Sequence, residues 1–280
     1  MYLSNYHSHS IFCDGRSHPE VFVQYAISKG LKAYGFSSHA PLPFLTNWTM
    51  KKDDVEEYFQ EINRLKEKYK DQIEVYAGLE TDYLSPEFNA KSDYFQALPA
   101  DYLISSIHYI SHPISNKLLA IDGSFKEFTQ GVKTHFGGDI KGVIERFFEL
   151  STQMIELGGF HIIGHVDKIY LNASRFAGFE SNQKLVDNLM DDLLITIAKS
   201  GLILEINTKS VESKGITYPM QHYFERIYEL SIPITINCDT HNPDNVIQGK
   251  RETAELLYKI GFRHTMELIS GKWQRYKLLN

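Results

Sequence analysis

The chain has 280 residues, and its 29 lysines and arginines against 35 aspartates and glutamates give a formal net charge of -6. With 17 Tyr, 17 Phe and 2 Trp it is rich enough in aromatic residues to exclude intrinsic disorder, and its length suffices for a large core. The acidic balance and the lack of a run of lysines and arginines argue against nucleic-acid binding. No stretch of about 18 apolar residues is present, which argues against a membrane span.

Short apolar runs that end in a polar residue alternate along the chain with longer stretches of helical periodicity. We predict strands at residues 2–6, 33–37, 73–79, 102–107, 161–164, 202–206 and 232–236. We predict helices at residues 19–29, 53–69, 141–157, 183–199, 219–230 and 245–260, with an inserted hairpin or loop at 109–121. No linker or internal repeat divides the chain, so we expect a single domain over residues 1–280 with an insertion at about 109–140.

The first helix carries a recognisable start signal. Ser17 precedes Pro19 and Glu20, which places a proline in the first turn and completes a capping box if Ser17 is the cap. We therefore expect Ser17 to cap this helix.

Strands that alternate with helices are parallel, because a parallel neighbour can be reached only through a long crossover. Nearly every predicted strand delivers a polar residue at its C-terminal end, which is where a closed parallel barrel gathers its active site. An open doubly wound sheet is the alternative, but such sheets usually gather ligands at one switch point. We expect an α/β fold, a distorted (β/α)7 barrel with its site at the C-terminal ends of the strands.

The densest chemical signal lies at the first predicted strand. His7 and His9 are two residues apart, so a strand points both imidazoles to one face, and Asp14 on a turn with Gly15 could fold back over that face. In a seven-stranded barrel the last strand lies beside the first. Asp239 and His241, at the end of the last strand, would then join them.

Four more candidates, His39, Glu80, His108 and His165, each end a strand of their own. The full set of candidate metal ligands is His7, His9, Asp14, His39, Glu80, His108, His165, Asp239 and His241. Nine ligands are too many for one ion, and nitrogen and oxygen donors without thiolate favour Zn, Mn or Fe. The sequence therefore predicts two or three divalent transition-metal ions.

These motifs occur in a recognisable order. They are His7-x-His9, Asp14-Gly15, Ser37-Ser38-His39, Gly78-Leu79-Glu80, Ser106-Ile107-His108, Gly164-His165-x-Asp167 and Asp239-x-His241. This order resembles the PHP superfamily, the polymerase and histidinol phosphatase phosphoesterases, over almost the whole chain. With the segment at residues 36–43, the chain most resembles the histidinol-phosphate phosphatases of histidine biosynthesis.

The resemblance implies a trinuclear metal site. By position, it assigns His7, His9, Glu80 and Asp239 to the first ion, Glu80, His108 and His165 to the second, and Asp14, His39 and His241 to the third. It implies metal-dependent hydrolysis of L-histidinol phosphate to L-histidinol and phosphate. By this resemblance, bound cations would lower the pKa of the attacking water, Glu80 would bridge two ions, and Asp239 or a metal-bound water would protonate the leaving alkoxide.

Phosphate recognition should use a guanidinium, whose planar fork matches two phosphate oxygens. Arg175, after His165, and Arg16, after Asp14 and Gly15, are the substrate-binding candidates, and Lys168 is a weaker one. A carboxylate and aromatic side chains would suit the histidinol portion. The loops after His39 and His108 supply the aromatic candidates Phe44, Trp48 and Tyr109 and, with them, Ile110.

Several alternatives stay open. Within the superfamily, the substrate could be another phosphomonoester: a nucleotide, a sugar phosphate or a phosphotyrosine. The chain could also be a non-catalytic PHP module or a metal-dependent amidohydrolase, although no lysine ends a predicted strand to serve as a carbamylated bridge.

The N-terminal segment lacks the basic then apolar pattern of a signal peptide, and two cysteines, Cys13 and Cys238, are too few for a disulfide scaffold. We expect a cytoplasmic enzyme that acts on a small phosphorylated substrate, with neither a nucleic-acid nor a membrane partner. The sequence does not indicate the oligomeric state.

Overall fold

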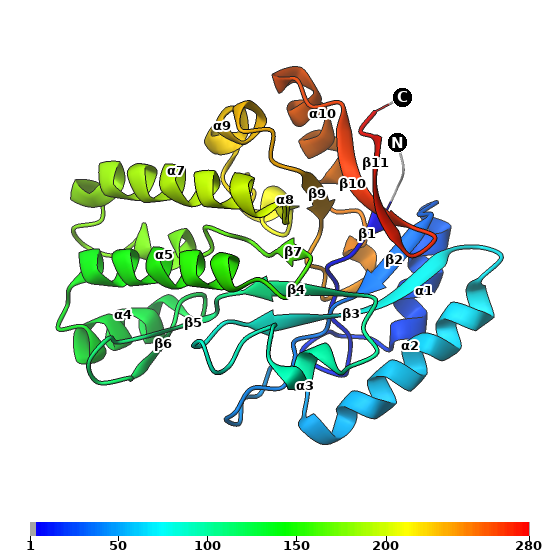
Figure 1. The fold of residues 1–280 in the computed structure, drawn as a ribbon, viewed down its shortest axis with the longest axis horizontal. Helices are drawn as coiled ribbons and strands as arrows, with labels where there is room; N and C mark the ends of the chain where they lie inside the picture. The colour runs from blue at the N-terminus through cyan, green and yellow to red at the C-terminus, as the bar shows by residue number, and fades with distance from the viewer. Residues whose placement is uncertain (1–3, 280) are drawn as a thin grey trace.

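A computed structural model describes residues 4–279 and shows a nearly closed barrel of seven parallel strands with helices around it (Figure 1). The order around the barrel is β1-β2-β3-β4-β7-β8-β9, so each strand pairs with the next along the main path of the chain. The barrel strands are β1 (Ser4–Asn5), β2 (Ala33–Phe36), β3 (Glu74–Asp82), β4 (Tyr102–Ser106), β7 (Ile162–Ile163), β8 (Ile203–Asn207) and β9 (Ile234–Asn237). The expected seven-stranded barrel is confirmed. Tyr2 and Leu3, part of the first predicted strand, lie outside the described residues.

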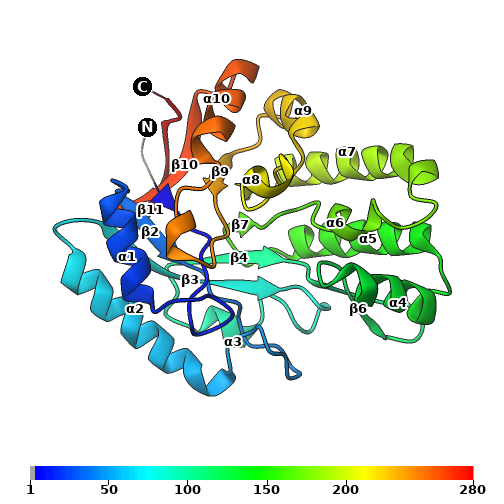
Figure 2. The same cartoon turned by 180° about the vertical axis from the view of Figure 1, so that it is seen from behind.

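Helices on the crossovers surround the barrel, and α5 and α7 lie side by side on one flank (Figure 2). The longer helices are α1 (Pro19–Ser28), α2 (Val55–Tyr69), α4 (Phe125–His135), α5 (Ile140–Leu157), α7 (Gln183–Ser200), α9 (Phe224–Glu229) and α10 (Lys250–Ile260). Short turns of helix are η1 (Lys52–Asp54), α3 (Asp93–Gln96), α6 (Tyr170–Ala173), η2 (Glu180–Asn182), α8 (Val211–Lys214), η3 (Gln221–Tyr223) and η4 (Pro243–Asn245). Within residues 4–279, no helix combines the length and the apolar character needed to cross a membrane.

The prediction that Ser17 caps the first helix is wrong. His18 is the cap, and its side chain accepts a hydrogen bond from the Glu20 backbone N–H at 3.4 Å. Pro19 occupies the first helical position, where its missing N–H costs nothing, and this places the cap one residue after Ser17. Glu20 is therefore one position too early for a capping box.

The barrel closes where the first and last strands meet. Toward the C-terminal ends of the strands, Ser8 and Thr240 form a parallel bridge, and the His9 N–H donates to the Thr240 carbonyl at 2.8 Å. Further down, the Asn237 side chain accepts from the Tyr6 N–H at 2.9 Å, and the Asn5 side chain accepts from the Cys238 N–H at 2.8 Å. Two asparagine side chains thus replace part of the backbone ladder at this seam.

The large side chain of Tyr102 is fully buried in the barrel, and its hydroxyl donates to the carbonyls of Tyr6 and Phe36. Its ring lies against Gly35 and Gly78. A Cβ atom at Gly35 would stand 2.4 Å from the Tyr102 hydroxyl, and one at Gly78 would stand 2.5 Å from its Cζ. Glycine at these two positions makes room for the ring.

Two antiparallel hairpins accompany the barrel. The first, β5 (Tyr109–Ser111) with β6 (Leu118–Ala120), lies in the expected insertion between β4 and α5, which also contains α4. The second, β10 (His264–Ile269) with β11 (Lys272–Lys277), was not expected. It packs Trp273 against Tyr6, with ring centroids 5.1 Å apart, and covers the end of the barrel away from the histidines.

Candidate metal centre

All nine side chains expected to be metal ligands come together at the C-terminal ends of the strands. They form four groups in which one ligand atom of each residue lies within 4.8 Å of the others. The groups are His9, Asp14, His39 and His241; His7, His165 and Asp239; His7, His9 and Glu80; and His39, Glu80 and His108. The barrel therefore gathers residues from both ends of the chain into one cluster.

Glu80, at the C-terminal end of β3, lies at the centre of the cluster and is 1% exposed. Its Oε2 atom is 3.2 Å from His7 Nε2 and 2.9 Å from His39 Nδ1. Its Oε1 atom is 2.9 Å from His165 Nε2. One carboxylate thus faces histidines from three other strands, which is the geometry that a bridging ligand requires.

Asp239 reaches the same centre from the last strand. Its Oδ1 atom is 3.3 Å from His9 Nε2 and 3.8 Å from His7 Nε2. The backbone of Asp239 has a φ of 47°, in the left-handed region that non-glycine residues rarely adopt. Such strained residues cluster at functional sites, where the surrounding structure holds them.

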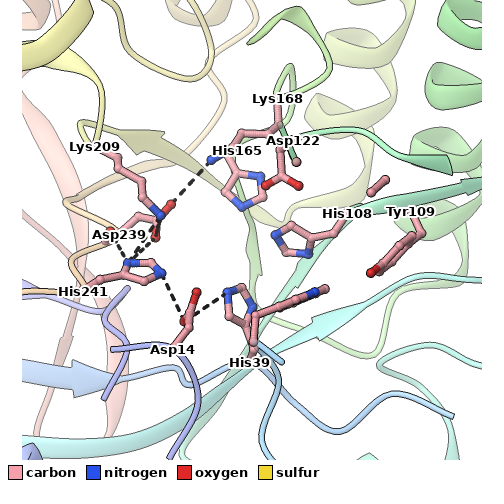
Figure 3. A pocket seen from close by; sticks show the side chains of 13 residues that line it. Asp14, His39, His108, Tyr109, Asp122, His165, Lys168, Lys209, Asp239 and His241 are labelled. Atoms are coloured by element: carbon pink, nitrogen blue, oxygen red, sulfur yellow. Dashed lines mark hydrogen bonds and ion pairs between the residues drawn. The ribbon is translucent and has the colours of Figure 1, made fainter. Parts of the chain in front are cut away.

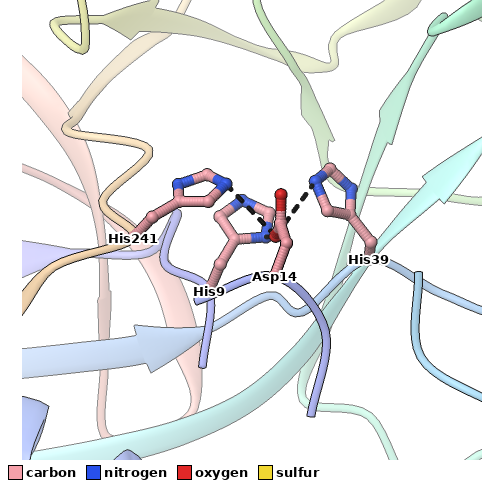
Figure 4. Close-up of side chains that lie close together, drawn as sticks. All are labelled: His9, Asp14, His39 and His241. Atoms are coloured by element: carbon pink, nitrogen blue, oxygen red, sulfur yellow. Dashed lines mark ion pairs between the residues drawn. The ribbon is translucent and has the colours of Figure 1, made fainter. Parts of the chain in front are cut away.

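Asp14 forms the outer group with three histidines (Figure 4). Its Oδ1 atom is 3.3 Å from His241 Nε2, 3.8 Å from His39 Nε2 and 3.9 Å from His9 Nδ1. The turn folds back because Gly15 has no side chain: a Cβ there would stand 2.2 Å from the His9 carbonyl oxygen. This close approach confirms the expected return of the Asp14 turn over the first strand.

Opposite charges control protonation in the cluster. Burial would lower the pKa of His7, but Glu205, Glu80 and Asp239 together raise it well above its ordinary value. Burial would raise the pKa of Glu80, but the surrounding histidines hold it well below the usual range. Burial lowers the pKa of His9, and the neighbouring histidines lower it further. The carboxylates are ionised, which suits the binding of cations.

Several buried nitrogen and oxygen atoms face this centre and, although they lie close to one another, form no hydrogen bond in the described part of the chain: His7 Nε2, His9 Nε2, His39 Nδ1 and Glu80 Oε2. Buried polar atoms are nearly always paired, so unpaired atoms that converge from different strands need an explanation. A divalent ion provides one, because imidazole nitrogen and carboxylate oxygen are its usual ligands. The residues therefore fit a metal centre.

Two carboxylates that the sequence analysis missed contact histidines of the cluster but belong to none of the four ligand groups. Glu205, fully buried on β8, lies 2.6 Å from His7 Nδ1, and Asp82, on β3, lies 3.0 Å from His108 Nδ1. Each carboxylate accepts a hydrogen bond from the Nδ1 atom of its histidine, which orients the ring so that the opposite nitrogen, Nε2, faces the cluster. A signal was present in both cases: Asp82 lies two residues after Glu80 on the same face of a strand, and Glu205 interrupts an apolar strand.

A cavity of about 230 Å³ opens on the cluster (Figure 3). Its cationic side chains are Lys168 and Lys209: Lys209 Nζ lies 2.9 Å from Asp239 Oδ1, and Lys168 Nζ lies 3.8 Å from Asp239 Oδ2. Lys168 was a weaker candidate in the sequence, and Lys209 was missed. It follows Asn207 at the end of β8, and this position is the signal that could have revealed it.

The two arginines expected to bind phosphate do not line this cavity. The Arg175 guanidinium instead lies over the Phe125 ring, 4.0 Å from its centroid. Arg16 is exposed and is held through its backbone N–H, which donates to the His241 carbonyl at 2.8 Å. Proximity in sequence to the ligands thus did not place either guanidinium in the cavity. Their role in phosphate binding remains a prediction.

The fold and the site define a parallel barrel protein with a cluster of metal-ligand side chains at its strand ends. The chain belongs to the PHP domain family, whose model matches residues 5–209. A histidinol-phosphatase from Bacillus subtilis is 27% identical over 259 residues, which cover 86% of this chain and 94% of the relative.

Two solved structures share the fold. The HisK protein of Listeria monocytogenes matches with a TM-score of 0.77 and 23% identity, over 89% of this chain and 99% of that one. Histidinol phosphate phosphatase from Lactococcus lactis, solved with zinc, L-histidinol and phosphate, matches with a TM-score of 0.73 and 22% identity, over 98% of this chain and 99% of that one.

Proposed function

We propose that this chain is a phosphoric monoester hydrolase that converts L-histidinol phosphate and water to L-histidinol and phosphate. The observation that carries the proposal is the cluster of six histidines and three carboxylates beside a cavity with two lysines, Lys168 and Lys209. The relatives named histidinol-phosphatase, which match across nearly their whole length, support this substrate.

We also propose that the cluster holds two or three divalent transition-metal ions, Zn, Mn or Fe. Glu80 with His7, His9 and Asp239 would hold one ion, Glu80 with His108 and His165 a second, and Asp14 with His39 and His241 a third. When bound, such ions supply positive charge for the phosphate oxygens and lower the pKa of an attacking water. The zinc in the Lactococcus lactis structure supports this choice of metal.

The remaining work falls to the protein's own groups. Lys209 and Lys168 bring positive charge to the part of the cavity next to Asp239, where they would bind phosphate oxygens and offset the charge that develops during transfer. Ionised Asp239 would accept a proton from the attacking water and pass it to the leaving alkoxide, either directly or through a second water. Burial of the cluster strengthens each of these interactions by excluding solvent.

The wider setting completes the proposal. Residues 1–280 would form a single PHP-type domain with an insertion at about 109–140. One apolar core with members from Phe22 to Leu278 supports a single domain. Cys13 and Cys238 are free thiols, in keeping with the cytoplasmic location that we propose. The partner would be a small phosphorylated substrate.

A substrate panel tests the function. Purified protein loaded with zinc or manganese would be assayed for phosphate release from histidinol phosphate, nucleoside monophosphates, sugar phosphates and phosphotyrosine. We expect the highest kcat/KM for histidinol phosphate. Equal or faster turnover of another phosphomonoester would remove the specific assignment, and loss of all turnover after chelation, restored by added metal, would support the metal requirement.

A further inference from the structure

One carboxylate in the cavity has no part in the chemistry described so far. Asp122 lines the cavity, yet it belongs to none of the four ligand groups. Within residues 4–279, no hydrogen bond or ion pair engages its side chain, although Lys168 and His108 lie close enough to act on its charge. A carboxylate repels phosphate, so its presence in a phosphatase cavity calls for a cationic partner.

The fold holds Asp122 firmly in this place. It follows β6, in the insertion, and the fully buried amide of Asn172 donates to the carbonyls on both sides of it, Ile121 at 3.0 Å and Gly123 at 2.9 Å. The Ile121 N–H donates to the His108 carbonyl at 2.9 Å. The backbone that carries Asp122 is thus fixed to the end of β4, next to the metal cluster.

Aromatic rings line one end of the cavity. Trp48 and Tyr109, both half-buried, stack with ring centroids 6.0 Å apart and an interplanar angle of 25°. In Figure 3, Tyr109 lies on the side away from Lys209 and Asp239, and Asp122 lies between them, beside Lys168. The cavity therefore has a cationic end near Lys209 and Asp239 and an aromatic end, with the Asp122 carboxylate between the two.

We infer that Asp122 is a specificity-determining residue that binds the ammonium group of an amino-alcohol phosphate, while Trp48 and Tyr109 hold a flat ring of the same substrate. This inference rests on the proposed function and names the part of the site that selects the leaving group. Phosphate at the lysine end and an ammonium at Asp122 place opposite charges of the substrate against opposite charges of the cavity. Such complementarity supplies selectivity, because a substrate without the ammonium leaves Asp122 unpaired.

The test compares two substrates that differ only in the amine: histidinol phosphate and its deamino analogue, 3-(imidazol-4-yl)propyl phosphate. We expect the wild type to prefer histidinol phosphate. Asp122→Asn should lower kcat/KM for histidinol phosphate by about 10- to 100-fold, the range for a hydrogen bond to a charged group, and leave the analogue nearly unchanged. Asp122→Glu, which keeps the charge, should retain part of the preference.

Glu127→Gln is the matched control, because Glu127 is an exposed acid of the same insertion and glutamine can keep its capping box with Ser124. Glu127→Gln should leave kcat/KM unchanged for histidinol phosphate and for the deamino analogue. Inhibition by the product L-histidinol gives a second measurement: Asp122→Asn should weaken it, whereas inhibition by phosphate should stay as in the wild type.

The failures can be told apart. An equal fall of kcat/KM for both substrates in Asp122→Asn would show that Asp122 acts on the phosphate end through Lys168, and this would overturn the inference. A preference that survives in Asp122→Asn would overturn it as well, with the proposed function intact. A wild type that does not hydrolyse histidinol phosphate would overturn the proposed function and the inference with it.

Discussion

Replacing Glu205 by glutamine removes one charge from beneath the cluster of candidate metal ligands without changing the size of the side chain. Glu205 Oε1 accepts hydrogen bonds from His7 Nδ1 at 2.6 Å and Asn237 Nδ2 at 3.1 Å. Its Oε2 accepts from the His165 N–H and from Asn207 Nδ2, both at 3.0 Å. Glutamine has only one acceptor oxygen, so its NH2 group must face two donors.

The magnitude follows from this count. Two hydrogen bonds to a charged acceptor are lost, and each is worth about 1.5 to 3 kcal/mol, so the free energy of unfolding of the metal-free protein should fall by about 3 to 6 kcal/mol. Because His7 also loses the carboxylate that fixes its ring, zinc affinity should fall by about 10- to 100-fold, the usual effect of removing an outer carboxylate.

The assay is a zinc titration against a chelating indicator, together with the metal content of the purified protein. Glu267→Gln is the control, because Glu267 is also a buried glutamate but lies at the opposite end of the barrel, where it accepts hydrogen bonds from the Tyr6 and Thr265 hydroxyls. The control should bind zinc as the wild type does. A Glu205→Gln protein with wild-type zinc affinity would refute the assignment of Glu205 as a positioning residue for His7.

Four further outcomes are expected. Glu80→Gln should remove a shared ligand, so zinc content and turnover should both fall by orders of magnitude, and wild-type turnover would exclude a bridging role. Lys168→Ala should raise KM for phosphomonoesters more than Arg175→Ala does in parallel kinetics, and the reverse order would restore the arginine as the phosphate contact. Gly78→Ala should destabilise the protein by about 1 to 3 kcal/mol in denaturant unfolding, because the added methyl overpacks the barrel interior. Burial lowers the pKa of His108, but neighbouring carboxylates raise it to about 10, so this histidine stabilises the metal-free protein fully below about pH 6.5 and ceases to do so as the pH rises through about 10. Thermal melts of the metal-free protein should therefore move to lower temperature over that interval, and a rise would contradict the argument.

The barrel could be predicted from the sequence because its signal is repeated. Nearly every predicted strand leads to a polar side chain, and periodicity placed α2, α5 and α7 within two residues at each end. The helix predicted at 245–260 begins at Lys250, and α4, inside the insertion, was not predicted. The C-terminal hairpin was missed because β11 is largely exposed and carries several charged residues, so it lacks the alternation that marks a half-buried strand.

For the site, the sequence predicted the residues that end strands and missed those that act from inside or from a loop. His7, Glu80 and Asp239 were found because strand ends converge in a barrel whatever the loops do. Glu205 lies within a strand, and its one sign in the sequence is that it interrupts an apolar run. Asp122 was missed for a different reason: its place depends on hydrogen bonds from Asn172, which lies 50 residues away in the chain, and no local pattern encodes such a contact.

The seam between the first and last strands has a consequence for biosynthesis. More than 200 residues separate Asp239 and His241 from His7 and His9, so a nascent chain presents the first two histidines long before these partners are synthesised. Metal capture at the proposed centre would therefore be a late event, coupled to closure of the barrel across Ser8 and Thr240. An ion that binds only the completed site would also stabilise the closed barrel, because separating the first and last strands would require the ion to dissociate.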